Sequence, residues 1–324
     1  MAPETKDGYI EHSLDIADSL AQVKNNHVKT YQEDGRKKIE ELYDSYLGLL
    51  KTKNWQVEKV ADSKTIWHGQ AISYPILAFK TKIKGSATYI LSGIHGEEPT
   101  GPNAIAESID TLSEMGKKRS MVLIPLCNPL GYLRNWRYLN KEKYTDSPEL
   151  VGMSVGDSDH FLVDPKDRTK ARGERPVNDE CSALSNYILR ISQYYPPAIS
   201  LDFHGDVLVP KGYIYSIGKD GEKDIVASQL LDILENNGIP IQWDGETRFG
   251  EEIIDGKVGP QEDGSIDELI SANKIIVDGK IVPGPGAERV FVLETPDADI
   301  PIEKRVNAYK AVISFLHDLE NSKF

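Results

Sequence analysis

Ionisable side chains stand at the ends of three apolar stretches of this sequence, where they could act together on one metal ion or substrate. The three ends read "ATYILSGIHGEE" (87–98), "AISLDFHGD" (198–206) and "RVFVLETP" (289–296). They carry His95 and Glu98, then Asp202 and His204, then Glu294. An ionisable group at the end of a buried strand costs desolvation free energy unless it has a partner. Three such ends in one chain therefore indicate a shared partner.

Two histidines and one carboxylate form a donor set typical of catalytic zinc sites. We predict that His95, Glu98 and His204 bind one zinc ion per chain. Such a site keeps one position for water, and zinc lowers the pKa of that water toward neutrality. A further carboxylate must then take up and pass on a proton, and Glu294 is the candidate general base.

Each of these residues also has a structural interpretation when it is taken alone. His95 would be a loop histidine, His204 a satisfied histidine at a strand end, and Glu294 the cap of a turn. The spacing histidine-x-x-glutamate also recurs at His317 and Glu320, which we interpret as a solvated helix end. The joint occurrence of the other residues at strand ends favours the metal site.

Short apolar runs alternate with helical stretches along the chain. The predicted strands are 72–80, 87–93, 121–127, 198–203, 213–217 and 289–294, and the predicted helices are 13–26, 36–53, 102–115, 179–195, 222–238 and 301–320. This alternation predicts a single α/β domain with a mixed, mostly parallel twisted sheet and helices on both faces. Sites in such sheets form at the carboxyl ends of the strands. Residues 138–178 have little periodicity, and we expect one long functional loop there.

Composition and charge exclude several classes of partner. The chain has 324 residues, 39% of them hydrophobic and 27% charged, and its net charge of −13 argues against nucleic acid or anionic membrane as the main partner. Its two cysteines, Cys127 and Cys181, give neither a disulfide framework nor a thiolate zinc cluster, so we expect free thiols. The polar N-terminus lacks the apolar stretch of a signal peptide, which predicts a cytoplasmic location.

The order of these motifs resembles the zinc metallocarboxypeptidase superfamily, which includes carboxypeptidase A-like and succinylglutamate desuccinylase–aspartoacylase-like enzymes. In that superfamily H-x-x-E comes first and an asparagine–proline turn with arginines follows. A lone histidine and then a glutamate, both at strand ends, come later. By this resemblance His95, Glu98 and His204 are the zinc ligands, and Glu294 is the general base.

A second segment that carries the resemblance supplies two arginines. "NPLGYLRNWRY" (128–138) resembles the family's N-P-x-G turn followed by R-x-W-R. The match implies that Arg134 polarises the scissile carbonyl and stabilises its oxyanion, and that Arg137 contacts the substrate. The alternative interpretation is a pair of surface arginines.

The best match to the family's substrate loop is "GDSDHF" (156–161), which departs from the family pattern. Asp157 is expected to orient a zinc-bound histidine, and Asp202 is a second such carboxylate. Asp159 and His160 stand where the family has the asparagine and arginine that grip a terminal carboxylate. An ionised aspartate cannot donate a hydrogen bond to a carboxylate, so an acidic loop suits a substrate that carries an amine.

Other features bear on the same loop. The basic segment "KDRTKARGER" (166–175) could supply the anion grip instead, and His160 could be a further metal ligand. The family's mobile tyrosine that covers the substrate has no counterpart here, because no tyrosine lies between Tyr215 and Tyr309.

The resemblance covers residues 38–320 and implies a catalytic domain at 38–324 that follows a helical extension at 1–37. It predicts a zinc-dependent hydrolase of a peptide or isopeptide C–N bond, acting on a peptide or an amino-acid-derived substrate. One alternative is an N-acyl amino acid deacylase of the aspartoacylase type, because "HGEEPTG" also resembles the HGNE turn of those enzymes. The other alternative is a non-catalytic binding protein that keeps the fold, with or without the zinc. The sequence predicts no oligomeric state.

Overall fold

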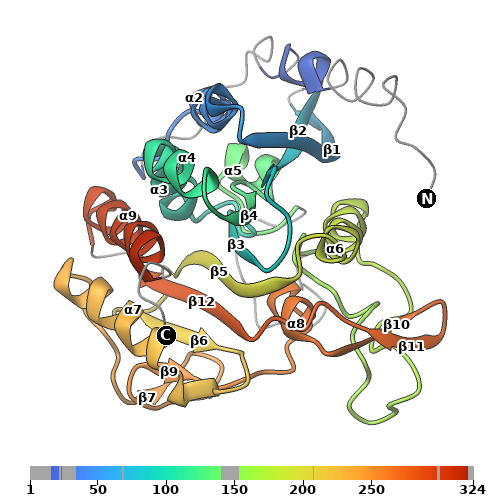
Figure 1. Ribbon diagram of the computed structural model, residues 1–324, viewed down its shortest axis with the longest axis vertical. Helices are drawn as coiled ribbons and strands as arrows, with labels where there is room; N and C mark the ends of the chain where they lie inside the picture. The colour runs from blue at the N-terminus through green and yellow to red at the C-terminus, as the bar shows by residue number, and fades with distance from the viewer. Residues whose placement is uncertain are drawn as a thin grey trace.

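The elements described below come from a computed structural model of the chain (Figure 1), which describes residues 16–21, 23, 34–67, 69–139, 153–206, 208–297 and 300–319. The strands are β1 (Trp55–Trp67), β2 (Gln70–Thr81), β3 (Ala87–Ser92), β4 (Ser120–Ile124), β5 (Pro197–Asp206), β6 (Tyr213–Ser216), β7 (Gly245–Glu246), β8 (Glu252–Ile253), β9 (Lys257–Val258), β10 (Lys274–Val277), β11 (Lys280–Pro283) and β12 (Arg289–Pro296). The helices are α2 (Ile39–Leu47), α3 (Thr100–Glu107), α4 (Ile109–Gly116), α5 (Pro129–Arg134), α6 (Asp179–Ser192), α7 (Ile225–Asn236), α8 (Ile266–Ser271) and α9 (Ile302–Leu319), with 3-10 turns η1 (Gly48–Thr52) and η3 (Gly221–Lys223).

One eight-stranded sheet carries the chemistry, in the order β1-β2-β4-β3-β5-β12-β6-β9. The four central strands β4, β3, β5 and β12 are parallel, whereas β1, β2 and β6 join the sheet by antiparallel pairing. Since neighbouring parallel strands end at the same edge of a sheet, the carboxyl ends of β3, β5 and β12 lie together. The predicted fold class, a mixed and mostly parallel sheet, is confirmed.

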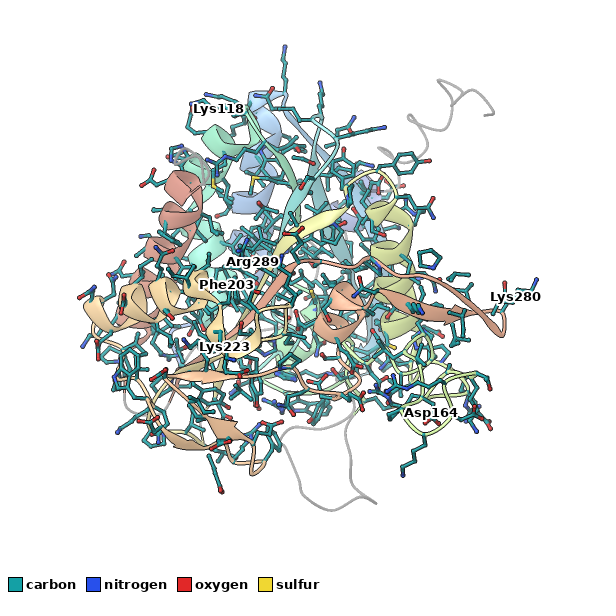
Figure 2. All side chains as sticks on the ribbon, turned by 60° about the horizontal axis from the view of Figure 1, so that its bottom comes forward. Lys118, Asp164, Phe203, Lys223, Lys280 and Arg289 are labelled. Atoms are coloured by element: carbon teal, nitrogen blue, oxygen red, sulfur yellow. The ribbon has the colours of Figure 1, made fainter. Side chains whose placement is uncertain are left out.

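Alternating side chains of the central strands face two separate apolar cores. On β12, Phe291 and Leu293 pack into the core that contains residues of α2, α3, α4, α7 and α9. Val290 and Val292 pack into the core on the other face, which contains residues of α6 and α8. Figure 1 shows α3, α4 and α9 on one side of the central strands and α6 on the other. Phe203 of β5 lies deep in the first core, whereas Lys280 at the tip of the β10–β11 hairpin lies at the periphery (Figure 2).

Several elements differ from the sequence-based expectation. Strand β1 was not predicted, because half-exposed residues over most of its length leave it without a clear apolar period. The predicted helix 102–115 is broken at Ser108, where non-helical dihedral angles separate α3 from α4. The six-residue helices α5 and α8 were also missed, since a helix of that length shows too little periodicity to be recognised. Within the predicted long loop, residues 153–178 form turns and isolated bridges.

The described part of the N-terminal extension packs on the sheet. Residues 16–21 and 23 are helical, and Ile16 and Val23 are buried in the same core as α2. Ser19 donates a hydrogen bond to Asp62 of β1 at 3.2 Å. Among the helices that the structure describes, none combines the length and the apolar character needed to cross a bilayer.

Candidate metal centre

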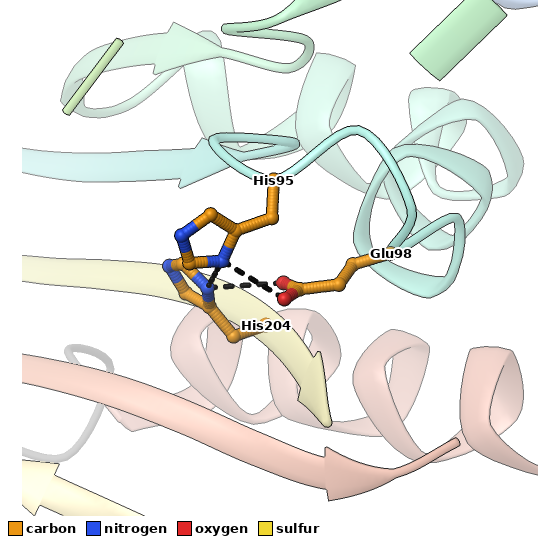
Figure 3. A group of neighbouring side chains, drawn as sticks. All are labelled: His95, Glu98 and His204. Carbon is orange, nitrogen blue, oxygen red and sulfur yellow. Dashed lines mark hydrogen bonds and ion pairs between the residues drawn. The ribbon is translucent and has the colours of Figure 1, made fainter. Parts of the chain in front are cut away.

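The loop between β3 and α3 carries His95 and Glu98, and its path is set by a close backbone contact. Gly96 lies against Gly131 of α5, so that a Cβ atom on Gly96 would be 1.9 Å from the carbonyl carbon of Gly131. Any side chain at Gly96 would therefore force the loop away from α5. The result is a sharp turn that directs the side chains of His95 and Glu98 toward β5 (Figure 3).

Strands β5 and β12 bring His204 and Glu294 together, because the two residues are register partners in the parallel pair. The side chains of a strand alternate between its faces, so Asp202 and His204 share one face of β5. Tyr309 of α9 donates its hydroxyl to the carbonyl of His204 and, at 2.8 Å, to that of Leu293. This bridge fixes the relative position of the two strand ends.

The side chains of the three predicted ligands converge on one point (Figure 3). Nδ1 of His95 lies 2.8 Å from Oε1 of Glu98. Nδ1 of His204 lies 3.0 Å from Oε2 of Glu98 and 3.2 Å from Nδ1 of His95. Glu98 and His204 are buried, with 2% and 6% of their surface exposed. The ligands of a tetrahedral zinc ion lie roughly 3.3 Å apart, given bonds of about 2.0 Å. The three donors therefore fit such an ion after small outward shifts.

Asp202 supplies the contact that would orient a metal-binding histidine. Its Oδ2 lies 3.1 Å from Nε2 of His204, and its carboxylate is fully buried. A carboxylate at Nε2 keeps a proton on that nitrogen and leaves the lone pair of Nδ1 for a metal. The backbone N–H of Gly205 donates to Oε2 of Glu98 at 3.1 Å and fixes that ligand as well.

Burial and charge set the protonation states of these residues without a metal. Burial, and then the positive charge of Arg137, lower the pKa of His95 to about 4, so its imidazole is neutral. Burial alone would lower the pKa of His204, but Asp202 and Glu98 raise it well above its usual value. Burial alone would raise the pKa of Glu98, but His95 and His204 hold it well below its usual range. Without a metal, the proton on His204 supplies a positive charge beside Glu98 and Asp202, and this proton must be released when a metal ion binds.

Asp267 of α8 belongs to the same site and was missed by the sequence interpretation. It is 3% exposed, and its carboxylate, that of Asp202 and the ring of His204 lie within 4.8 Å of one another. Burial, and then the charge of Asp202, raise the pKa of Asp267 well above its usual value. The segment "IDELIS" gave no signal of this role, because acidic residues are common in the first turn of a helix.

The two arginines of the R-x-W-R match lie in different surroundings. Arg137, predicted to contact substrate, is 7% exposed, and its Nη1 lies 2.8 Å from Oε1 of Glu98 and 3.0 Å from Oε1 of Glu97. Arg134, predicted to polarise the carbonyl, instead donates to Oγ1 of Thr65 at 2.6 Å and stacks over Trp136. The arginine beside the candidate metal ligands is therefore Arg137.

The loop that carries Asp157, Asp159 and His160 makes mostly local contacts. Oδ1 of Asp157 accepts a hydrogen bond from the backbone of Asp159, and Asp202 is the carboxylate found beside His204. Arg172 belongs to the basic segment that could bind an anion. Its Nη1 lies 3.2 Å from Oδ1 of Asp159, and its guanidinium forms a bidentate ion pair with the carboxylate of Glu268. Its charge is thus already balanced by two carboxylates.

Glu294 is half-buried at the end of β12. Burial raises its pKa to about 8, with further contributions from the negative charges of Glu98 and Asp206. Asp206 is 4% exposed and accepts a hydrogen bond from Nη1 of Arg248 at 2.9 Å. A carboxylate with a raised pKa at the edge of a metal site has the basicity that a general base requires.

Arg36, from the predicted N-terminal extension, supports the loop that carries the ligands and was also missed. Its side chain is fully buried and donates to the carbonyl oxygens of Gly96 at 3.1 Å, of Glu97 at 3.4 Å and of Tyr132. The carboxylate of Asp34 balances its charge. No signal in the sequence could find this role, because the partners are backbone atoms 60 to 96 residues away.

The histidine of the second histidine-x-x-glutamate pair lies at a helix end. His317 pairs with Asp318 at the exposed end of α9, as the interpretation of a solvated helix end requires. Glu320 and His68 lie outside the described residues.

Comparison with known proteins gives matches at the level of structure. No protein-family model matches the sequence, and no curated protein sequence matches it. A protein of Shewanella amazonensis provisionally assigned as a metallopeptidase superposes with a TM-score of 0.67 at 18% identity, covering 87% of this chain and 93% of its own. Carboxypeptidase A from Helicoverpa armigera gives a TM-score of 0.55 at 15% identity, covering 97% of this chain and 82% of its own. A metallo-carboxypeptidase from Burkholderia cenocepacia gives a TM-score of 0.53 at 10% identity, covering 89% of this chain and 70% of its own. The chain therefore has the fold of the metallo-carboxypeptidases, as the resemblance predicted.

Proposed function

We propose that this protein is a zinc-dependent hydrolase that cuts a C–N bond of a peptide or isopeptide. The observation that carries the proposal is the approach of the donor atoms of His95, Glu98 and His204 to within 2.8–3.2 Å of one another. Two imidazoles and one carboxylate leave a bound zinc ion with net positive charge and an open position, which is the arrangement of catalytic rather than structural sites. The fold shared with metallopeptidases agrees with this reading.

The residues around the donors suit the steps of hydrolysis. A bound zinc ion supplies Lewis-acid activation of a water molecule and of the substrate carbonyl. Glu294 accepts a proton from the attacking water and later delivers it to the leaving amine. Arg137 stabilises the negative charge that develops on the carbonyl oxygen, and Glu97 holds its guanidinium in place. Asp202 keeps His204 in the tautomer that binds metal.

The substrate we propose carries a free amine close to the scissile bond. Asp157 and Asp159 occupy the loop where the family places its carboxylate-gripping residues, and both have a pKa raised first by burial. The nearby Arg172 is paired with Glu268 and Asp159, so the loop offers little net positive charge to a terminal carboxylate. A matched pair of peptides that end in lysine or in norleucine tests this preference, because the two differ in little beyond the amine. Equal kcat/KM values for the two peptides would contradict it.

Metal analysis on the purified protein is the first experiment. We expect the His204→Ala variant to lose about one zinc per chain relative to the wild type, together with all hydrolysis. His317→Ala, at the far end of α9, is the matched control and should lose neither. Wild-type protein that holds no metal at this site after zinc is added back would contradict the proposal and favour the non-catalytic alternative. Cleavage of N-acyl amino acids in place of peptides would favour the deacylase alternative.

A further inference from the structure

His160 has an unusual environment for a histidine on a loop. Both ring nitrogens are shielded from solvent, and neither has a hydrogen-bond partner among the residues that the structure describes. The ring of Phe161 lies 4.3 Å away, centroid to centroid, and covers part of the imidazole. A neutral imidazole has one donor and one acceptor, and leaving both unpaired costs free energy that a bound ion or ordered water would recover.

Two further metal-type ligands face the same place. A carboxylate oxygen of Asp157, the thiol of Cys181 and a ring nitrogen of His160 all lie within 4.8 Å of one another. Cys181 is fully buried in the first turn of α6, and its Sγ lies 2.6 Å from the carbonyl oxygen of Asp157. The chain's other cysteine, Cys127, is buried behind β4 and contacts the carbonyl of Ile124, so the two thiols have different surroundings.

We propose that Asp157, His160 and Cys181 form a second metal site, for a divalent ion such as zinc that accepts nitrogen and sulfur ligands. This donor set matches the preference of zinc for thiolate, imidazole and carboxylate, with water in a fourth position. The site shares no residue with the cluster of His95, Glu98 and His204. On binding, the thiol of Cys181 becomes a thiolate and releases one proton to solvent, while the imidazole binds as the neutral base.

The donors lie close enough for this site to form after a small adjustment. Tetrahedral zinc ligands lie roughly 3.3–3.6 Å apart, and the three donors lie within 4.8 Å of one another, so they need to contract by at most about 1.5 Å. Asp157 and His160 lie on the loop and Cys181 on α6, so side-chain rotation with a small loop shift is sufficient. The orphaned nitrogens of His160 give this contraction a driving force, because a metal bond replaces one of the missing contacts.

The position of the site suggests what the ion would do. Asp157 forms a backbone bridge with Ser265 at the start of α8, and the backbone of Ser158 donates to Gly264 at 2.6 Å. Farther along the loop, the backbone N–H of Ile276 in β10 donates to Phe161. Figure 2 shows the loop, marked by Asp164, next to the β10–β11 hairpin, marked by Lys280. An ion here would tie the loop of Asp157–His160 to α6 and, through Asp157, to the helix that carries Asp267.

Cobalt substitution tests the proposal, because only this site has a sulfur ligand. Full-length protein stripped of metal and reloaded with Co²⁺ should show a thiolate-to-cobalt charge-transfer band in the near ultraviolet. Cys181→Ser and His160→Gln should each remove most of that band, whereas the matched control Cys127→Ser should leave it unchanged. Zinc content should fall from about two ions per chain to about one in either variant.

The outcome does not depend on whether the protein is a hydrolase. A folded wild-type protein that binds Co²⁺ without a thiolate band overturns the second site, even if peptide hydrolysis is found. Conversely, His204→Ala should abolish hydrolysis and keep the thiolate band. If Cys181→Ser fails to fold, the wild-type spectrum and His160→Gln still decide the question.

Discussion

The two clusters of metal-type ligands in this chain differ in how their donor atoms are held. Those of His95, Glu98 and His204 stand 2.8–3.2 Å apart, whereas in the loop cluster of Asp157, His160 and Cys181 the ring nitrogens of His160 have no hydrogen-bond partner among the described residues. In the first cluster the donors come from strand ends and from a loop pressed against α5. In the second, two of the three donors come from a loop built of turns.

Supporting contacts explain the difference. Glu98 accepts from the backbone of Gly205 and from Arg137, and His204 is held by Asp202 at its ring and by Tyr309 at its carbonyl. The ring nitrogens of His160 have no such partner in the described part of the chain. A site supported in this way is preorganised before the metal arrives, whereas the loop cluster would be assembled by the ion itself. The predictions below test this contrast, from the largest expected effect to the smallest.

Replacing Glu294 by glutamine should have the largest effect. The amide cannot accept the proton of the attacking water, so kcat/KM should fall by about 10²–10⁴-fold while the metal content stays the same. Steady-state kinetics with zinc analysis on the same sample measures both quantities. Glu251→Gln is the matched control, since the Glu251 carboxylate accepts hydrogen bonds from Tyr215 and Thr247. Retention of activity by Glu294→Gln would mean that another group is the base.

Two aspartate variants separate the clusters directly. Asp202→Asn should weaken metal binding at the first cluster by about 10–100-fold, because the amide no longer stabilises the Nε2–H tautomer of His204 in the same way. Asp157→Asn should leave that affinity unchanged and weaken the thiolate band of the loop cluster instead. Competition with a chelator, followed in the cobalt spectrum, gives both affinities. Equal weakening of the first cluster by Asp157→Asn would restore the role that the sequence assigned to Asp157.

Arg36 links the N-terminal segment to the first cluster. Arg36→Met leaves the carbonyls of Gly96 and Tyr132 and the carboxylate of Asp34 without their buried partner, so the free energy of unfolding should fall by about 2–4 kcal/mol. Metal affinity at the first cluster should fall about tenfold, because the loop loses its support. Arg119→Met removes the hydrogen bonds to the carbonyl oxygens of Leu316 and His317 at the end of α9. It should destabilise the fold with no change in metal affinity.

The contrast between strand ends and loops also explains which parts of the site could be predicted from the sequence and which could not. Strand ends with ionisable residues could be recognised in the sequence, because apolar runs that end in His204 and in Glu294 occur in one chain with His95. The fold class followed from the alternation of strands and helices and is confirmed. The structure also brings His95, Glu98 and His204 together, and that they bind zinc stays a prediction.

The missed residues act through contacts that leave no local pattern. Arg36 binds backbone carbonyls, and Asp267 meets Asp202 because α8 packs against β5. The sequence could not show which of Arg134 and Arg137 lies beside Glu98, because they lie three residues apart and the chain turns sharply between them. Asn135, with a positive φ of 56°, ends α5 and sends Arg137 toward Glu98.

The smallest effect should appear in the pH dependence of hydrolysis. Glu294 must be ionised to act as a base, and burial, Glu98 and Asp206 raise its pKa to about 8 without metal. A bound dication opposes that rise, so the acid limb of kcat/KM should have its midpoint between the ordinary value of 4.5 and about 8. Asp206→Asn removes a negative neighbour, which lowers the pKa of Glu294 and moves the limb to lower pH. If the pKa of Glu294 falls by up to about one unit, kcat/KM of the variant is up to about tenfold higher than that of the wild type at pH values below the midpoint of the acid limb.

The control for this experiment comes from the loop. Asp164→Asn removes an exposed charge at a turn of residues 153–178, and its acid limb should coincide with that of the wild type. A limb that moves to higher pH in Asp206→Asn would mean that the titrating group is not a carboxylate next to Asp206. A limb that moves equally in both variants would mean that overall charge sets the profile. Only a shift confined to Asp206→Asn ties the pH dependence to the edge of the sheet where β5 and β12 end.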